Sequence, residues 1–145
     1  MKTLVNEVRC RFFAVSENES FARSMAVTFA SQASPTITQL ADIKCAVSEA
    51  VTNCIVHAYP NGGGTVDMNM RRYNNGEIVL TVKDKGVGIA DVAAAREPLY
   101  TTDTTGERSG MGFSIMESMT DSLKVKSTPE KGTTVTMKIK VGAGS

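Results

Sequence analysis

The stretch SEAVTNCIVHAY, residues 48–59, decides how this sequence folds, and it carries three polar side chains at successive four-residue spacings. These side chains are Glu49, Asn53 and His57. At about 100° per residue, positions four apart on an α-helix differ by only about 40°, so the three fall within an arc of about 80°. We therefore expect this arc to face something polar.

The helix that carries the arc has a long apolar stripe on another side. After the turn at Ser34 and Pro35, Thr36 and Gln39 match a capping box that would begin the helix. The run from Pro60 to Gly64 would end it. The apolar residues that recur at helical spacing are Leu40, Ile43, Val47, Ala50, Val51, Cys54 and Ala58. This pattern predicts a helix packed against a core.

The composition is that of an ordinary globular domain. The 145 residues are 41% hydrophobic and 21% charged, so we expect a single domain over residues 1–145. The net charge of +1 argues for neither a nucleic-acid nor a membrane partner. Because no apolar run approaches the ~18 residues of a membrane span and the start lacks a signal-peptide layout, we expect a cytoplasmic protein. The 3 cysteines show no C-x-x-C spacing, which suggests neither a disulfide framework nor a zinc site.

Two elements are expected before the long helix. Residues 8–13 alternate apolar and basic side chains, which indicates an opening strand. Ser16 and Glu19 match another capping box, which predicts that a helix begins there. Its predicted buried stripe consists of Phe21, Met25 and Phe29.

After the long helix, the apolar pattern changes to a period of two. Residues 66–70 and 78–82 alternate on either side of Asn74-Asn75-Gly76, which predicts a β-hairpin. Residues 123–125 and 135–141, across a turn at 128–132, predict a second antiparallel pair whose outer face carries lysines.

Between the two strand pairs the sequence is mostly polar. Residues 91–96 indicate one or two helical turns, and we interpret residues 97–110 as a mobile lid. Phe113, Met116 and Met119 then mark a short amphipathic helix. Together, the elements predict an α/β two-layer sandwich, in which a mostly antiparallel sheet is covered by helices on one face.

The polar arc of the long helix suits phosphoryl-transfer chemistry. The amide oxygen of Asn53 can ligate Mg²⁺, which takes few protein ligands when phosphates supply the rest. Glu49, one turn earlier, can accept a proton from the group that attacks a terminal phosphate. The alternative is a glutamate on the helix surface and an asparagine that hydrogen-bonds to nearby backbone. His57 has no visible titrating partner, so we interpret it as a neutral, hydrogen-bonded histidine without a catalytic role.

A second candidate site residue, Asp84, lies at the end of a predicted strand. Gly86 and Gly88 follow it and let the backbone approach a ligand closely. A carboxylate in this place can accept a hydrogen bond from the amino group of adenine. An ordinary Asp-rich turn is the alternative.

A glycine-rich segment at residues 106–112 runs into the last predicted helix. The unpaired backbone N–H groups at a helix start suit phosphates. The segment is neither a Walker A loop nor a dinucleotide fingerprint. Arg108 can stabilise phosphate charge during transfer, and a solvated arginine is the alternative.

These patterns are short, but their order is specific. E-x-x-x-N on a long helix is followed by D-x-G-x-G, a polar lid, R-S-G-M-G-F at a helix start and K-G-T-T before the last strand. In this order they resemble the Bergerat ATP-binding fold shared by gyrase B, a heat-shock chaperone, histidine kinases and MutL. The segments NESFAR, SEAVTN, IVHAY, AAREPLYTT and ERSGMGFSIME are further similar to the anti-sigma F factors of spore-forming bacteria, a family of small serine kinases.

The resemblance implies a role for each matching residue. Asn53 would ligate Mg²⁺ and Glu49 would be the catalytic base. Asp84 would bind adenine with Thr133 nearby, in a pocket shaped by the two glycines that follow Asp84. The ATP phosphates would be held by Ser109, Gly110, Met111 and Gly112, with Arg108 close to the terminal one.

The resemblance also implies partners. Such kinases are homodimers that sequester a sporulation sigma factor when ATP is bound, and that phosphorylate a serine of an anti-anti-sigma protein. Arg23 matches the partner-docking arginine and Glu107 would share its surface, with solvated charges as the alternative. Lys85 departs from the family by replacing an acidic residue, and Ala58 by replacing a glycine. Two further readings remain open: a related kinase of a stress-response pathway, and a nucleotide-gated binding module without turnover.

Overall fold

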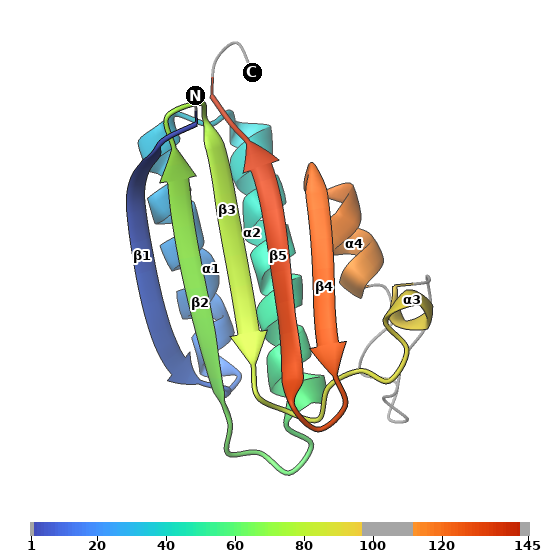
Figure 1. The fold of residues 1–145 in the computed structure, drawn as a ribbon. Helices are drawn as coiled ribbons and strands as arrows, with labels where there is room; N and C mark the ends of the chain where they lie inside the picture. Colours follow the sequence, from blue (N-terminus) through green and yellow to red (C-terminus); the bar gives the residue numbers. More distant parts are fainter. Residues whose placement is uncertain (1, 97–111, 143–145) are drawn as a thin grey trace.

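The computed structural model describes residues 2–96 and 112–142, and its centre is a five-stranded sheet in the order β1-β2-β3-β5-β4 (Figure 1). Every neighbouring pair of strands in this sheet is antiparallel. The strands are β1 Leu4–Phe13, β2 Thr65–Tyr73, β3 Glu77–Asp84, β4 Ser122–Thr128 and β5 Gly132–Lys140. The helices are α1 Glu17–Ala30, η1 Ser31–Ala33, α2 Ile37–Asn53, the π-helical turn η2 Cys54–Ala58, α3 Val92–Ala95 and α4 Gly112–Ser118.

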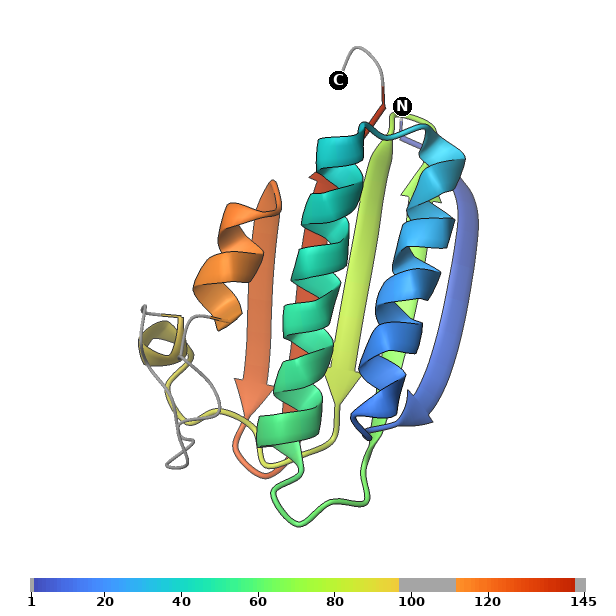
Figure 2. The same cartoon turned by 180° about the vertical axis from the view of Figure 1, so that it is seen from behind.

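The molecule has two layers. Helices α1, α2 and α4 lie side by side on one face of the sheet (Figure 2), and no helix of the described residues covers the opposite face (Figure 1). The predicted α/β two-layer sandwich is therefore confirmed. None of the helices in the described residues is long and apolar enough to span a membrane.

The core lies between these layers. Because strand side chains alternate between faces, every second residue of the central strands enters the core: Val66, Met68, Met70, Ile78, Leu80, Val82, Val135, Met137 and Ile139. Helix α2 meets them with Ile43, Val47, Ala50 and Val51, as its apolar stripe predicts. The predicted capping box of α2 is also present, since Thr36 accepts from the Gln39 N–H at 3.1 Å and the Gln39 side chain accepts from the Thr36 N–H at 2.8 Å.

Helix α1 differs from its prediction in two ways. Ser16 makes no capping hydrogen bond, because its backbone already has helical angles whereas a capping residue needs an extended conformation. Glu19 instead pairs with Arg23 at 3.0 Å. Phe21 was expected in the core but is 56% exposed. The buried side of α1 consists of Ala22, Ala26, Phe29 and Ala30, and the three small alanine side chains allow the helix to lie close to its neighbours.

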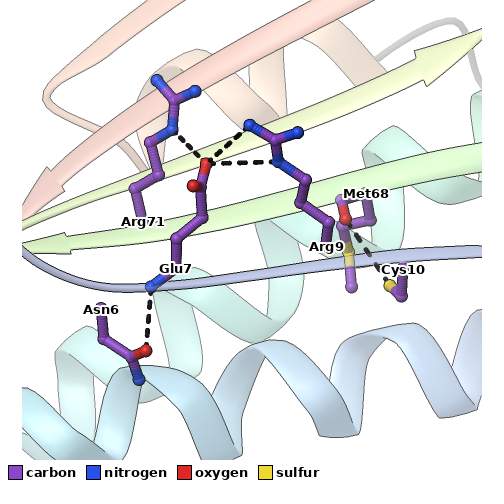
Figure 3. A network of polar contacts seen from close by, with 6 residues as sticks. All are labelled: Asn6, Glu7, Arg9, Cys10, Met68 and Arg71. Atoms are coloured by element: carbon purple, nitrogen blue, oxygen red, sulfur yellow. Dashed lines mark hydrogen bonds and ion pairs between the residues drawn. The ribbon is translucent and has the colours of Figure 1, made fainter.

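Strand β1 begins at Leu4, earlier than the predicted start at residue 8, and a register shift between Leu4 and Asn6 interrupts its pairing with β2. Side chains between the two strands form a polar network (Figure 3). Glu7 accepts from Arg71 at 2.7 Å and from Arg9 at 3.5 Å. The hydrogen bond from Arg71 is the main reason why the pKa of Glu7 lies below its usual value.

Candidate functional site

A cavity of about 410 Å³ opens at the end of the sheet where α2 ends and the β4–β5 turn lies. Its walls come from the end of α2, η2, the segment after β3, α3, the start of α4 and β5. The residues that line it are Ala50, Asn53, Cys54, His57, Ala58, Pro60, Asp84, Val87, Gly88, Ile89, Ala90, Ala95, Gly112, Phe113, Thr133 and Val135. A mostly apolar cavity with a few convergent polar groups is typical of a small-molecule site.

The polar arc of the long helix reaches this cavity in part. Asn53, the last residue of α2, and His57, in η2, both line it. Glu49 is half-buried one turn before Asn53 and is not among the lining residues that the structure describes. The predicted arc assumed α-helical spacing throughout, whereas η2 is a wider π-helical turn, a distortion that is frequent at functional sites.

Asp84 provides a buried carboxylate in the cavity wall. It is 5% exposed, and its Oδ1 accepts from the backbone N–H of Gly86 at 2.9 Å and of Thr133 at 3.2 Å. Thr133 lies directly across the β3–β5 pair, so the sheet register brings these two residues together. Within the described part of the chain no cation pairs with this carboxylate. It therefore remains available to accept from a polar ligand.

The second oxygen of Asp84 is approached by a thiol that the motif analysis did not assign. The Sγ of Cys54 donates to Oδ2 at 3.5 Å. Burial, reinforced by the negative charge of Asp84, raises the pKa of Cys54 well above its usual value, so the thiol keeps its proton and acts as a donor. The sequence signal was indirect, since Cys54 follows Asn53 and belongs to the apolar stripe.

The two glycines after Asp84 allow close backbone packing around the cavity. A Cβ on Gly86 would overlap the carbonyl oxygen of Ala58, which also accepts from Val87 N–H at 2.9 Å. Gly88 has φ +74° and lies against the backbone of Thr128, so a side chain there would be both strained and crowded. Ala58, which the resemblance places where the family has a glycine, thus supplies a carbonyl that supports the loop after β3.

A hydroxyl cluster joins three segments behind the cavity. The Oγ of Ser127 accepts from Ile89 N–H at 2.7 Å and lies 2.8 Å from Thr133 Oγ1 and 3.1 Å from Gly132 O. Nothing in the sequence singled out Ser127, which is one of several polar residues on β4. The contact exists because Ser127 and Thr133 are partners in the β4–β5 ladder.

The remaining predicted residues do not all fall within the described part. The lid at 97–110, including Glu107, Arg108, Ser109 and Gly110, lies outside the described residues, as does Met111. Gly112 begins α4 and lines the cavity. Arg23 lies on α1, where it pairs with Glu19, and does not line the cavity.

The donor set constrains any metal at this site. The described residues contain no cluster of three or more His, Cys, Asp or Glu side chains that could enclose an ion. The Asn53 amide at the cavity wall fits a Mg²⁺ ion that obtains its remaining ligands from phosphates and water. These residues therefore fit a magnesium–nucleotide complex better than a metal held by the protein alone.

The fold is that of an ATPase domain. Residues 14–139 match a family model described as "Histidine kinase-like ATPase domain", so the chain has the predicted ATP-binding fold. The RsbU and RsbW domains of a Mycobacterium tuberculosis protein superpose with a TM-score of 0.66 at 16% identity, over 94% of this chain and 33% of that one. The mycobacterial sensor histidine kinase MprB superposes with a TM-score of 0.59 at 15% identity, over 92% of this chain and 98% of that one.

The relatives at higher identity specify the family further. An anti-sigma F factor of Caldanaerobacter subterraneus is 49% identical over 94% of this chain and 95% of its own length. One of Clostridium acetobutylicum is 48% identical over the same shares. The chain therefore belongs to the anti-sigma F factor family, and the resemblance noted from the sequence is confirmed.

Proposed function

We propose that this protein is an ATP-dependent protein serine kinase that also acts as an anti-sigma factor in the cytoplasm. In this proposal it sequesters a sporulation sigma factor and phosphorylates a serine of an anti-anti-sigma protein. The observation that carries the nucleotide part is the Asp84 carboxylate, buried in the wall of a 410 Å³ cavity without a cationic partner among the described residues.

Asp84 recognises the adenine base. Two backbone N–H groups hold Oδ1, so the carboxylate cannot rotate freely and Oδ2 keeps a fixed direction. An ionised carboxylate only accepts hydrogen bonds, which suits the exocyclic amino group of adenine. Thr133 and Gly88 line the same cavity, and the glycines at 86 and 88 let the loop after β3 pack closely against the backbone of Ala58 and Thr128.

Asn53 and Glu49 act at the phosphate end. Mg²⁺, when bound, neutralises phosphate charge and orients the terminal phosphate. Asn53 supplies an amide oxygen to the ion. The oxygen of the attacking serine hydroxyl bonds to the terminal phosphorus while the bond from that phosphorus to ADP breaks. Glu49 accepts the proton of this hydroxyl. In the described structure Glu49 is half-buried, one turn from Asn53.

The segment before α4, together with the first residue of that helix, completes the nucleotide site in this proposal. Ser109, Gly110, Met111 and Gly112 hold the phosphates, and Arg108 stabilises the charge of the terminal phosphate during transfer. Arg23 and Glu107 belong to the surface that docks the protein partners. The active form is a homodimer.

The test is the intact mass of the anti-anti-sigma protein after incubation with this chain, Mg²⁺ and ATP. We expect one added phosphate, and a rate lower by about 10²–10⁴-fold with Glu49→Gln, as for removal of a positioned base. Glu17→Gln, which alters an exposed carboxylate on α1, is the matched control and should leave the rate unchanged. Transfer at the normal rate by Glu49→Gln would show that Glu49 is not the base.

Two other outcomes would point to the alternative functions. If ATP binds and the anti-anti-sigma protein gains no phosphate, the chain is a nucleotide-gated binding module for this partner. If a serine of a partner protein from a stress-response pathway is phosphorylated instead, the chain is a kinase of that pathway. The binding-module function is a specific alternative because Glu49, the proposed base, is not among the described residues that line the cavity.

A further inference from the structure

We propose that Ser127 is a positioning residue that makes Thr133 a hydrogen-bond acceptor toward the cavity, and so contributes to selection of adenine. This inference rests on the proposed nucleotide-binding function. It follows from assigning each proton in the hydroxyl cluster behind the cavity, which consists of Ser127, Thr133, Ile89 N–H and Gly132 C=O.

Two members of the cluster have fixed polarity. The backbone N–H of Ile89 can only donate, so the Ser127 oxygen accepts from it at 2.7 Å. The carbonyl of Gly132 can only accept, and Ser127 Oγ lies 3.1 Å from it with donor geometry. Ser127 has a single proton, so it donates either to Gly132 or to Thr133, whose Oγ1 lies 2.8 Å away.

Only one of these two arrangements gives every proton of the cluster an acceptor among the described residues. If Ser127 donates to Gly132, the Thr133 hydroxyl donates to Ser127 and all the donors of the cluster are paired. If Ser127 donates to Thr133, the Thr133 proton has no acceptor within the described residues. Thr133 is only 9% exposed, so the first arrangement, which pairs every proton of the cluster within the described residues, is preferred over one that leaves the Thr133 proton to solvent in the cavity.

The end of the cavity that is lined by Asp84 and Thr133 therefore presents hydrogen-bond acceptors to a ligand. The proton of Thr133 points to Ser127, which leaves the oxygen lone pairs for a ligand or a bridging water. Asp84 beside it is also an acceptor, and the proton of Cys54 is directed to Asp84 Oδ2. A base edge with an amino group matches this set, whereas a base with an oxo group in the same place would meet lone pairs on both sides.

Ser127 is not among the residues that line the cavity, so this role is exerted through Thr133. Ser127→Ala would free the Thr133 hydroxyl to turn its proton toward the ligand. Binding of ATP and of inosine triphosphate, which has an oxo group in place of the amino group, therefore tests the proposal. We expect the preference for ATP over inosine triphosphate to fall about three- to tenfold in Ser127→Ala.

A double-mutant cycle identifies the route of the effect. In a Thr133→Val background, Ser127→Ala should no longer change the ratio of the two affinities, because the hydroxyl that it releases is absent. Ser127→Thr keeps the hydroxyl and should retain the wild-type ratio. Ser122→Ala, on the exposed start of the same strand, is the matched control.

The outcomes separate this inference from the proposed function. Equal weakening of both nucleotides by Ser127→Ala, or a ratio change that persists with Thr133→Val, would show a merely structural role and overturn the inference. Failure of the wild-type chain to bind ATP would overturn the proposed function itself, and the inference with it. If Ser127→Ala does not fold, Thr133→Val alone still decides. An unchanged ratio of the ATP and inosine triphosphate affinities in Thr133→Val would show that the Thr133 hydroxyl does not distinguish the two bases.

Discussion

The thiol of Cys54 lies 3.5 Å from Oδ2 of Asp84, so the residue directly after the proposed magnesium ligand touches the proposed adenine-binding carboxylate. The two residues are 30 positions apart in the sequence. One belongs to the π-helical turn after α2 and the other ends β3. The contact links the helix that carries Asn53 to the sheet that carries Asp84. Cys54, the neighbour of Asn53 in the sequence, thereby connects the proposed phosphate end of the site to its proposed adenine end.

Asp84→Asn should weaken ATP binding and reverse the preference for the base. The Asn oxygen would take the place of Oδ1, where two backbone N–H groups donate, and its NH₂ group would take the place of Oδ2. A donor there opposes the amino group of adenine and suits an oxo group. We expect ATP affinity to fall by about tenfold or more, as measured by competition of ATP and inosine triphosphate against a fluorescent nucleotide. Unchanged ATP affinity would contradict the placement of adenine.

Asn53→Asp should impair phosphoryl transfer and leave the fold intact. Asn53 faces the cavity rather than the core, so the new charge acts on the nucleotide. An aspartate there changes the charge and hydrogen bonding of the proposed Mg²⁺ ligand, and a misplaced terminal phosphate can cost about 10²-fold in rate. Circular dichroism and the intact-mass assay measure the two effects. Asn75→Asp, in the exposed β2–β3 turn, is the control, and global unfolding of Asn53→Asp would refute the placement.

Cys54 should be the slowest of the three cysteines to react with iodoacetamide at pH 8. Burial raises the pKa of all three thiols, and that of Cys54 the most. Each unit of increase lowers the reactive thiolate fraction about tenfold. Peptide mass spectrometry of the folded protein at successive times gives the three rates, and the denatured protein is the control. Faster labelling of Cys54 than of Cys45 would contradict its burial.

The same pKa shift predicts a loss of stability at high pH. The folded state keeps the Cys54 proton after the unfolded thiol has ionised, so the stabilisation is complete below about pH 8.5 and declines as the pH rises toward the folded pKa. Urea unfolding between pH 7 and 10 should show this decline, and Cys54→Ala should reduce its slope. Cys45→Ala, at a half-buried thiol, should change the slope less. An equal slope in wild type and Cys54→Ala would exclude this origin.

Gly86→Ala should destabilise the fold by about 3 kcal/mol, because its Cβ would overlap the carbonyl oxygen of Ala58 and displace backbone. Gly63→Ala is the matched comparison. Its Cβ would meet no atom within 4 Å, although its φ of +81° is unfavourable for alanine, and we expect a cost of about 1 kcal/mol. Urea unfolding of both variants measures the difference. A larger effect at Gly63 would argue against the close contact at Gly86.

Much of the architecture follows from local patterns. The apolar stripe of α2, its capping box and the alternation in β2, β3 and β5 were all readable, because helical and strand periodicities are properties of neighbouring residues. The prediction for α1 was wrong at Ser16 and Phe21. A capping pattern does not fix the backbone angles of its first residue, and alanines can form a buried face when the adjacent elements come close.

The sequence by itself determined most of the elements and their order, with Asn53 on a long helix and Asp84 at the end of a strand. Tertiary structure alone decided which side chains meet them. Asp84 is bonded to a residue 49 positions away, and Ser127 to one 38 positions away. The β3–β5 register brings Thr133 to Asp84, and the π-helical turn brings Cys54 to the same carboxylate. Neither follows from a local pattern, since pairing across strands is not encoded in either strand alone.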